Sequence, residues 1–266
     1  MNAIQLYARY IGISIRSQME YRASFAMQTL AHFLLTGIDF VALWALFERF
    51  DTIQGWSLYE VCVFYGMISV AFSINDALTR GFDVFPRLLK QGDFDRYLLR
   101  PRSTLLQLFG YELRLTRFGR FAQAWIVLLF GLSHLNIALT VPKLALIGWT
   151  MCGAVCLFMG LLLLQATFAF WTTESLEIMN TLTYGGIETA QYPLTIYHEW
   201  FRKFFTFLVP LGCVNYFPLL LLLNRYNPAH DPAWLYALSP VAGIVFLFAG
   251  LLAWHVGLRH YASTGS

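Results

Sequence analysis

Long apolar runs with very few charges are the feature that most restricts the fold of this chain. Residues 25–47, 144–171 and 234–258 are long enough for helical crossings, because about 20 mostly apolar residues span a hydrocarbon core roughly 30 Å thick. Charged residues make up only 12% of the 266 residues, whereas ordinary soluble domains carry roughly 25%. The sequence therefore predicts a single all-α, polytopic membrane domain.

Six crossings are expected, and the fifth of them is ambiguous. Residues 59–75 and 121–139 supply two crossings besides the three above. In one interpretation residues 204–223 form the remaining span and the polar stretch 172–192 is cytoplasmic. In the other, 172–192 crosses inside the bundle and the proline-broken segment 193–224 dips back as a re-entrant hairpin, which requires cover from protein or a water-filled cavity. Both interpretations give the same number of crossings.

Residues 1–24 are expected to form an amphipathic helix ahead of the first crossing. Ile4, Tyr7 and Ile11 follow helical spacing, and Arg9 and Arg16 fall on the opposite face. Such a helix tends to lie in the headgroup layer; a soluble helix packed on a partner is the alternative. The segment lacks the apolar core and cleavage site of a signal peptide, so we expect the first crossing itself to direct insertion.

The distribution of Lys and Arg predicts the orientation. If the N-terminus is inside, most of the 18 basic residues lie in segments on that side, chiefly residues 1–24 and 79–120. Cytoplasmic loops carry an excess of Lys and Arg, so both termini are predicted to be cytoplasmic. Outer-membrane barrels show short alternating strands instead of long apolar helices, so a plasma membrane is expected.

Residues 79–120 are too charged to cross and are predicted to form a compact cytoplasmic segment. Pro86 is expected to begin a short helix there, and Gly92 and Pro101 punctuate the rest. Between them, acidic and basic side chains precede an apolar ridge at residues 97–99. Arginines that bind anionic lipid would each contribute about 1 kcal/mol. Lipid contact does not explain the two prolines or the Gly-Asp-x-Asp-Arg turn at residues 92–96. We therefore expect this segment to dock on another protein.

Three stretches of the chain resemble, in order, the parts of a known family. The run LLKQGDFDRYLLRPRS (residues 88–103) resembles the coupling helix of type-2 ATP-binding-cassette (ABC) exporter permeases, which sits in a groove of the ATPase. SQMEYRASF (17–25) resembles the end of the family's interfacial elbow helix. YPLTIYHEWFRKFFTFLVPLGCVNYFP (192–218) resembles its extracellular re-entrant hairpin. The branch that the chain is most similar to is the viologen-exporter-like permeases, which are encoded with an ATPase and a second, similar permease.

This resemblance implies a subunit of an ATP-driven exporter in a bacterial inner membrane. Two permeases, identical or paralogous, would face each other above two ATPase subunits, with membrane lipids around them and no nucleic acid involved. The resemblance also implies that residues 172–192 are the fifth crossing. The residues that it assigns to ATPase coupling are Phe85, Arg87, Asp93, Asp95, Arg96, Tyr97 and Arg100.

Motifs for nucleotide or metal chemistry are absent from the sequence. No G-x-x-x-x-G-K-[ST] loop occurs to hold ATP phosphates, and no H-E-x-x-H or EF-hand pattern occurs. The six histidines are scattered, and His198 and His230 merely precede an acid. The chain is therefore expected to be no enzyme and to hold no cofactor, with ATP and Mg²⁺ bound by the partner ATPase.

Carboxylates within or beside the spans are candidates for the translocation path, because a charge in hydrocarbon is costly. Asp39 is the clearest, Glu60 flanks the second span, and Glu188 lies on the polar stretch 172–192 together with Glu174 and Glu177. The rival hypothesis is a secondary transporter in which Asp39, Glu60 and Glu188 bind protons or sodium. Such transporters commonly contain internal repeats, and none is evident here.

Small residues at regular spacing predict faces where helices pack closely. In the fourth span these are Gly148, Cys152, Cys156 and Gly160, and in the last span Gly243, Gly250 and Gly257. Small side chains let helix backbones approach in lipid. Cys152 and Cys156 are four residues apart and could also form a metal or redox pair, but the packing interpretation accounts for the whole stripe.

Overall fold

The computed structural model describes residues 3–135, 137–172, 176–227 and 232–261, and within these residues it contains helices and no β-strand. The longer helices are α1 (Ala3–Glu20), α2 (Arg22–Arg49), α3 (Leu58–Leu78), α7 (Phe118–His134), α8 (Val141–Phe168), α9 (Leu176–Ala190) and α13 (Val241–His260). The shorter ones are α4 (Arg80–Lys90), α5 (Asp95–Leu98), α6 (Thr104–Phe109), α10 (Glu199–Lys203), α11 (Phe217–Leu222) and α12 (Ala233–Leu238).

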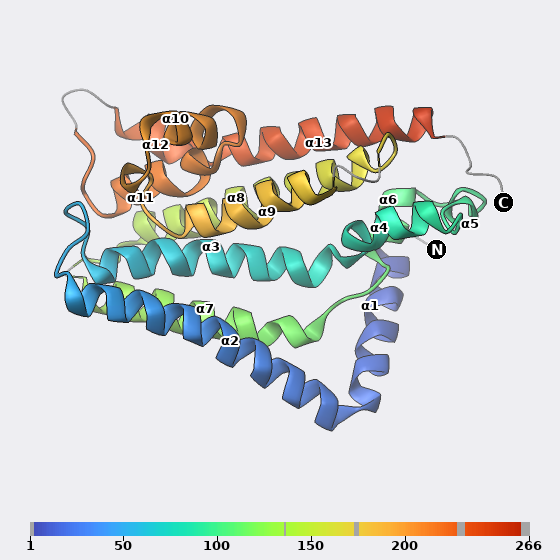
Figure 1. Ribbon diagram of the computed structural model, residues 1–266, viewed down its shortest axis with the longest axis horizontal. Coiled ribbons are helices and arrows are strands. Elements are labelled where there is room, and N and C mark those ends of the chain that lie inside the picture. Colours follow the sequence, from blue (N-terminus) through green and yellow to red (C-terminus); the bar gives the residue numbers. More distant parts are fainter. Residues whose placement is uncertain (1–2, 136, 173–175, 228–231, 262–266) are drawn as a thin grey trace.

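The long helices lie lengthwise and separate two ends of the molecule (Figure 1). Helices α4, α5 and α6 lie at one end, together with the start of α1 and the end of α13, and α10, α11 and α12 lie at the other. Among the described residues, α2, α3, α8 and the α12–α13 stretch (Ala233–His260) are long and apolar enough to cross a membrane. The predicted all-α, polytopic membrane fold is thus confirmed.

Helices α7 and α9, with 17 and 15 residues, are shorter than the four candidate spans. Both lie alongside the bundle (Figure 1), and α9 contacts α3 and α8. The apolar segment after α9 does not form a straight rod. Its two parts, Glu199–Leu208 and Gly212–Leu222, meet at an angle of 84°, with Pro210 at the break. The amide of Asn215 ties this hairpin to the end of α9 by donating to the Ala190 carbonyl at 2.7 Å.

Helix α3 is the centre of the bundle. It begins with a capping box in which Ser57 and Glu60 satisfy each other's backbone N–H groups. In its apolar stretch 83% of the residues are buried. Gly66 lets α7 approach closely, because a Cβ at this position would lie 2.6 Å from the Cβ of Leu128. A larger residue there would have to displace α7.

Helices α8 and α13 pack along a stripe of glycines. Gly153 and Gly160 of α8 face Gly243 and Gly250 of α13, and a Cβ on Gly243 would lie 2.1 Å from the Gly153 carbonyl oxygen. Glycine-to-glycine contact of this kind lets backbones approach in lipid. The stripe on α8 is displaced from the expected one. A Cβ on Gly148 would meet no atom outside its own helix within 4 Å, and Cys152 and Cys156 are exposed and half-buried, respectively. Gly160 is the member of the expected stripe that packs on α13.

Helix α1 lies crosswise to the other helices (Figure 1), as an interfacial elbow would. Ser14 exchanges hydrogen bonds of 3.0 Å with both backbone groups of Leu113. Gln18 accepts from the N–H of Leu115 at 2.9 Å and donates to the Leu113 carbonyl. The elbow is therefore fixed to the segment that joins α6 to α7.

Candidate functional site

The segment α4–α6 has a buried face that anchors it to the ends of two long helices. Phe85 and Phe94 are fully buried, and their rings meet edge to face at 4.9 Å. The centre of the Phe85 ring also lies 4.9 Å from that of Trp254 in α13 and 5.1 Å from that of Phe170, just beyond α8. Aromatic contacts of this kind contribute about 0.5–1.5 kcal/mol each beyond area burial.

A hydrogen bond reinforces this anchor. The hydroxyl of Tyr261, at the end of α13, donates to a carboxylate oxygen of Asp95 in α5 at 2.8 Å. The same tyrosine ring lies 5.2 Å from Phe94. These two contacts join the start of α5 to the end of α13.

The opposite face of this segment is exposed and basic. Arg87, Lys90 and Arg96 are exposed. Leu99, beside them, is apolar and 85% exposed. Exposed apolar groups rimmed by polar ones are typical of protein interaction sites. We call the surface formed by Arg87, Lys90, Arg96, Leu98 and Leu99 the basic ridge.

The structure divides the predicted coupling residues between these two faces. Phe85 belongs to the anchor, as does Asp95 through Tyr261. Asp93 pairs with Arg96 at 3.6 Å, and Arg100 lies 5.5 Å from the centre of the half-buried Tyr97 ring. Arg87 is exposed. Sequence reasoning did not select Phe94, Trp254 or Tyr261, because aromatic residues are common in this chain and carry no local signal.

The expected helix start at Pro86 is wrong. Pro86 lies inside α4, which begins at Arg80. Thr79 is the residue that separates α3 from α4, and its hydroxyl donates to the Asn75 carbonyl at 2.6 Å. The break thus occurs where a side chain satisfies the last turn of α3, well before the proline.

Ion pairs join α3 and α4 to the segment before α7. Arg117 pairs with the buried Asp76 of α3 at 2.9 Å, and Arg80 of α4 pairs with Glu112 at 4.0 Å and with Asp83 of its own helix at 3.5 Å. Burial, followed by the negative charge of Asp76, raises the pKa of Asp83 above its ordinary value. The end of α3 that adjoins α4 is therefore fixed by charge as well as by packing.

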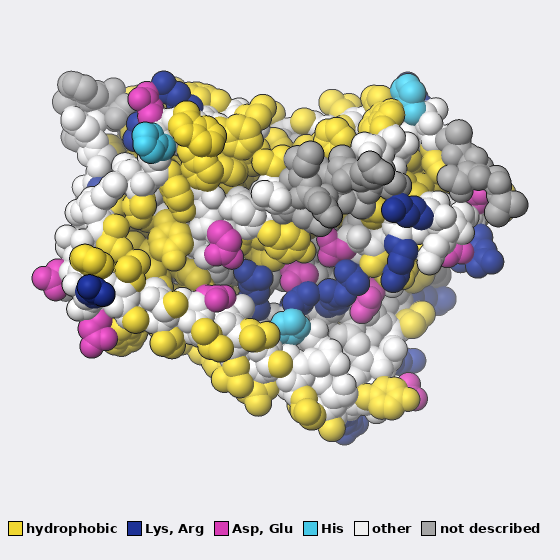
Figure 2. Space-filling model, in the orientation of Figure 1, with side chains coloured by type: hydrophobic (Ala, Val, Ile, Leu, Met, Phe, Trp, Pro, Cys, Tyr) yellow, Lys and Arg dark blue, Asp and Glu magenta, His cyan; other side chains and the backbone are white. Residues whose placement is uncertain are grey.

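A second group of charges lies at the level of the spans, where Figure 2 shows acidic and basic side chains along the middle of one face. Asp39 of α2 and Glu188 of α9 are exposed, and within the described part of the chain neither carboxylate has a hydrogen bond or ion pair. Glu188 lies close enough to Arg120 and to Asp39 to interact electrostatically with each of them. The Nε of Arg120 is buried without a hydrogen-bond partner.

Glu60, the third predicted path residue, lies apart from this group. Its carboxylate is buried and pairs with Arg225 at 2.6 Å, and the Arg225 guanidinium lies 4.5 Å from the centre of the Trp56 ring. Glu60 thus joins the start of α3 to the segment after α11. Glu174 lies outside the described residues, and so does the side chain of Glu177.

Within the described ranges, no group of three or more His, Cys, Asp or Glu side chains is arranged to hold a metal ion. The features that the described residues do offer are an anchored basic ridge at one end and charged side chains along one face of the bundle.

A comparison with protein-family models identifies the family of this chain. Residues 33–265 match the model described as ABC-2 family transporter protein. The chain belongs to the ABC-2 transporter family. No curated protein matches it, and no solved structure does. The family match confirms the resemblance to type-2 ABC permeases, and the viologen-exporter-like branch stays a prediction. It also makes the chain a multi-pass membrane permease component.

Proposed function

We propose that this ABC-2 protein is the permease subunit of an ATP-driven exporter and that its basic ridge docks on a separate ATPase. The observation that supports this most is the two-faced α4–α6 segment. It exposes Leu99 amid arginines on one side and is joined by Phe85, Phe94 and Asp95 to α13 and the end of α8 on the other. ATP and Mg²⁺ would be bound by the ATPase.

The second part of the proposal is a permease partner that covers α2 and α9. Only 11% of the apolar stretch of α2 is buried. A carboxylate such as Asp39 or Glu188 facing lipid would cost several kcal/mol. A second permease, identical or paralogous, would remove this cost by enclosing both carboxylates in a shared cavity. Differential contacts of the ATPase with two states would then shift access to that cavity.

The proposed topology has six crossings in a bacterial inner membrane. Helix α9 would be the fifth crossing, and the bent segment after it the re-entrant hairpin. The end with α4–α6 and both termini would face the cytoplasm, in keeping with its basic residues. This topology places the basic ridge where ATP-hydrolysing subunits are found.

The test is ATP hydrolysis by the reassembled complex. The double variant Arg96→Glu/Leu99→Ala should lose at least tenfold of the ATPase activity that the permease stimulates, with normal membrane insertion. Arg202→Glu, an equal charge reversal on the exposed face of the hairpin, should leave it unchanged. Unchanged stimulation in the double variant would remove the ridge from the mechanism, and transport by the chain alone under an ion gradient would favour a secondary transporter.

A further inference from the structure

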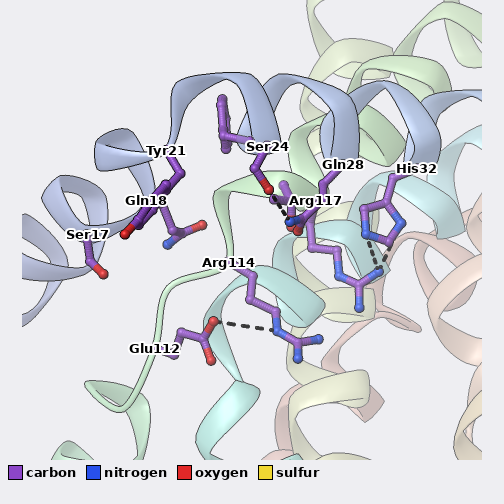
Figure 3. Close-up of a pocket in the computed structure, with 11 residues that line it drawn as sticks. Ser17, Gln18, Tyr21, Ser24, Gln28, His32, Glu112, Arg114 and Arg117 are labelled. Carbon is purple, nitrogen blue, oxygen red and sulfur yellow. Dashed lines mark hydrogen bonds and ion pairs between the residues drawn. The ribbon is translucent and has the colours of Figure 1, made fainter.

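A polar cavity of about 470 Å³ lies between α1, the first half of α2 and the connection 111–117 that precedes α7 (Figure 3). Its α2 wall is a stripe of Ser24, Gln28 and His32 at steps of four residues, on a helix whose other exposed side chains are mostly apolar. Arg114 and Arg117 form the opposite wall. None of these residues belongs to the basic ridge.

The proposed topology, on which this inference rests, would place the cavity at the level of the lipid headgroups. Helix α1 lies crosswise at the end of the bundle that carries α4–α6, and an interfacial helix settles at the boundary between headgroups and acyl chains. The cavity opens beside the first turn of α2. No side chain caps the N-terminus of α2, and its first turn contains no acidic residue, so its dipole adds to the attraction for an anion.

The charges of the cavity walls are only partly neutralised. Arg117 is paired with Asp76, and its guanidinium also lies 3.3 Å from the His32 ring. Among the residues that the structure describes, the Arg114 guanidinium pairs only with Glu112, at 4.0 Å, which is beyond hydrogen-bond distance. Burial, and then the neighbouring Arg80 and Arg117, lower the pKa of Arg114. A guanidinium in such surroundings binds phosphate well, because the fork of N–H groups matches its oxygens.

We propose that this cavity binds the phosphate of a lipid headgroup in the cytoplasmic leaflet, with Arg114 as its main ligand and Ser24 and Gln28 as hydrogen-bond donors from α2. The Glu112 carboxylate repels an anion that carries no donor of its own, but it can accept a hydrogen bond from an N–H or O–H group next to the phosphate. It therefore favours headgroups that carry an ammonium or hydroxyl group, such as ethanolamine or glycerol, over choline. The bound lipid would link the elbow to α2 and to the segment before α7.

Native mass spectrometry of the purified full chain tests this site, with no ATPase present, so that the result does not depend on the proposed function. The probes are dioleoyl phosphatidylethanolamine, phosphatidylglycerol and phosphatidylcholine at matched concentrations. The wild type should retain the first two at least several-fold better than the third. Arg114→Gln, and separately Ser24→Ala/Gln28→Ala, should each weaken retention about tenfold, a loss of about 1.4 kcal/mol.

The matched control is Arg102→Gln, which removes an exposed arginine elsewhere in the cytoplasmic segment and should retain lipid like the wild type. Glu112→Gln should reduce the preference over phosphatidylcholine without lowering total retention. Inorganic phosphate at 10 mM is added in a separate arm. If added phosphate leaves lipid retention unchanged, the site takes its phosphate from a bilayer lipid. If added phosphate displaces lipid from the wild type but not from Arg114→Gln, free phosphate from solution occupies the same site. Equal retention by wild type, Arg114→Gln and Ser24→Ala/Gln28→Ala, or equal losses in Arg102→Gln, would overturn the proposal.

Discussion

Helices α2 and α3 are both apolar enough to cross the membrane, yet their surroundings differ sharply. In α3, 83% of the apolar stretch is buried, and its acids are paired: Glu60 with Arg225 and Asp76 with Arg117. In α2 the buried share is 11%, and Asp39 has no partner within the described residues. The difference teaches that the contacts of α3 are supplied within one chain, whereas most of α2 is left uncovered by it, as the proposed permease partner would require.

The largest effect should come from breaking a buried pair on α3. Asp76→Asn leaves Arg117 uncompensated and should lower the free energy of unfolding by about 3–5 kcal/mol. The matched change on α2, Asp39→Asn, removes a carboxylate that has no partner within the described residues. It should change the free energy of unfolding by less than about 0.5 kcal/mol. Unfolding of the purified chain in detergent measures both. Equal losses would contradict the comparison.

Glycine substitutions sharpen the same contrast. Gly66→Ala on α3 places a methyl group 2.6 Å from the Leu128 side chain, so overpacking should cost about 1–3 kcal/mol. Gly37→Ala on α2 meets nothing within 4 Å and should leave the isolated chain as stable as the wild type or slightly more so. Thermal denaturation separates them, and a stable Gly66→Ala variant would show that α3 and α7 are less tightly packed than described.

A smaller effect is expected where the ridge segment meets α13. Tyr261→Phe removes the hydrogen bond to Asp95, worth about 1 kcal/mol, and should reduce permease-stimulated ATP hydrolysis a few-fold while the ATPase still binds. Tyr111→Phe, which alters a tyrosine on the surface of the same segment, serves as the control. If Tyr261→Phe stimulates hydrolysis normally, movement of α5 does not reach α13 through this contact.

The smallest effect concerns pH. The pKa of Asp83 is raised, so the folded chain binds a proton there more tightly than the unfolded chain does. Stability should therefore fall as pH rises from the ordinary carboxyl pKa through the folded pKa of Asp83. Asp83→Asn should flatten this part of the profile of melting temperature against pH. A profile that keeps its slope in the variant would assign the effect to another group.

Apolar runs sufficed to predict the membrane fold, and the charge of residues 79–120 identified the segment that contains the basic ridge. The sequence did not show that Phe85 is buried, because an aromatic residue near arginines fits an anchor and a contact surface equally well. The partner of Glu60 was also out of reach, since Arg225 lies 165 residues away.

Helix phase explains the remaining error. Helix α8 is apolar around its whole circumference, so several glycine stripes are equally compatible with its sequence. Gly153 and Gly160 face α13, while Gly148 does not. Which stripe packs is decided by where α13 lies, and local spacing contains no information on that.

The most direct test of the account is photo-crosslinking in living cells from a photoreactive amino acid placed at Leu99, with Trp200 on the hairpin as the control position. We predict that Leu99 forms an adduct with a chain that carries the ATP-binding sequence G-x-x-x-x-G-K-[ST], and that Trp200 does not. Efficient labelling at Leu99 that captures no such ATPase, or capture of the ATPase from Trp200 instead, would contradict the claim that this permease is driven through its basic ridge.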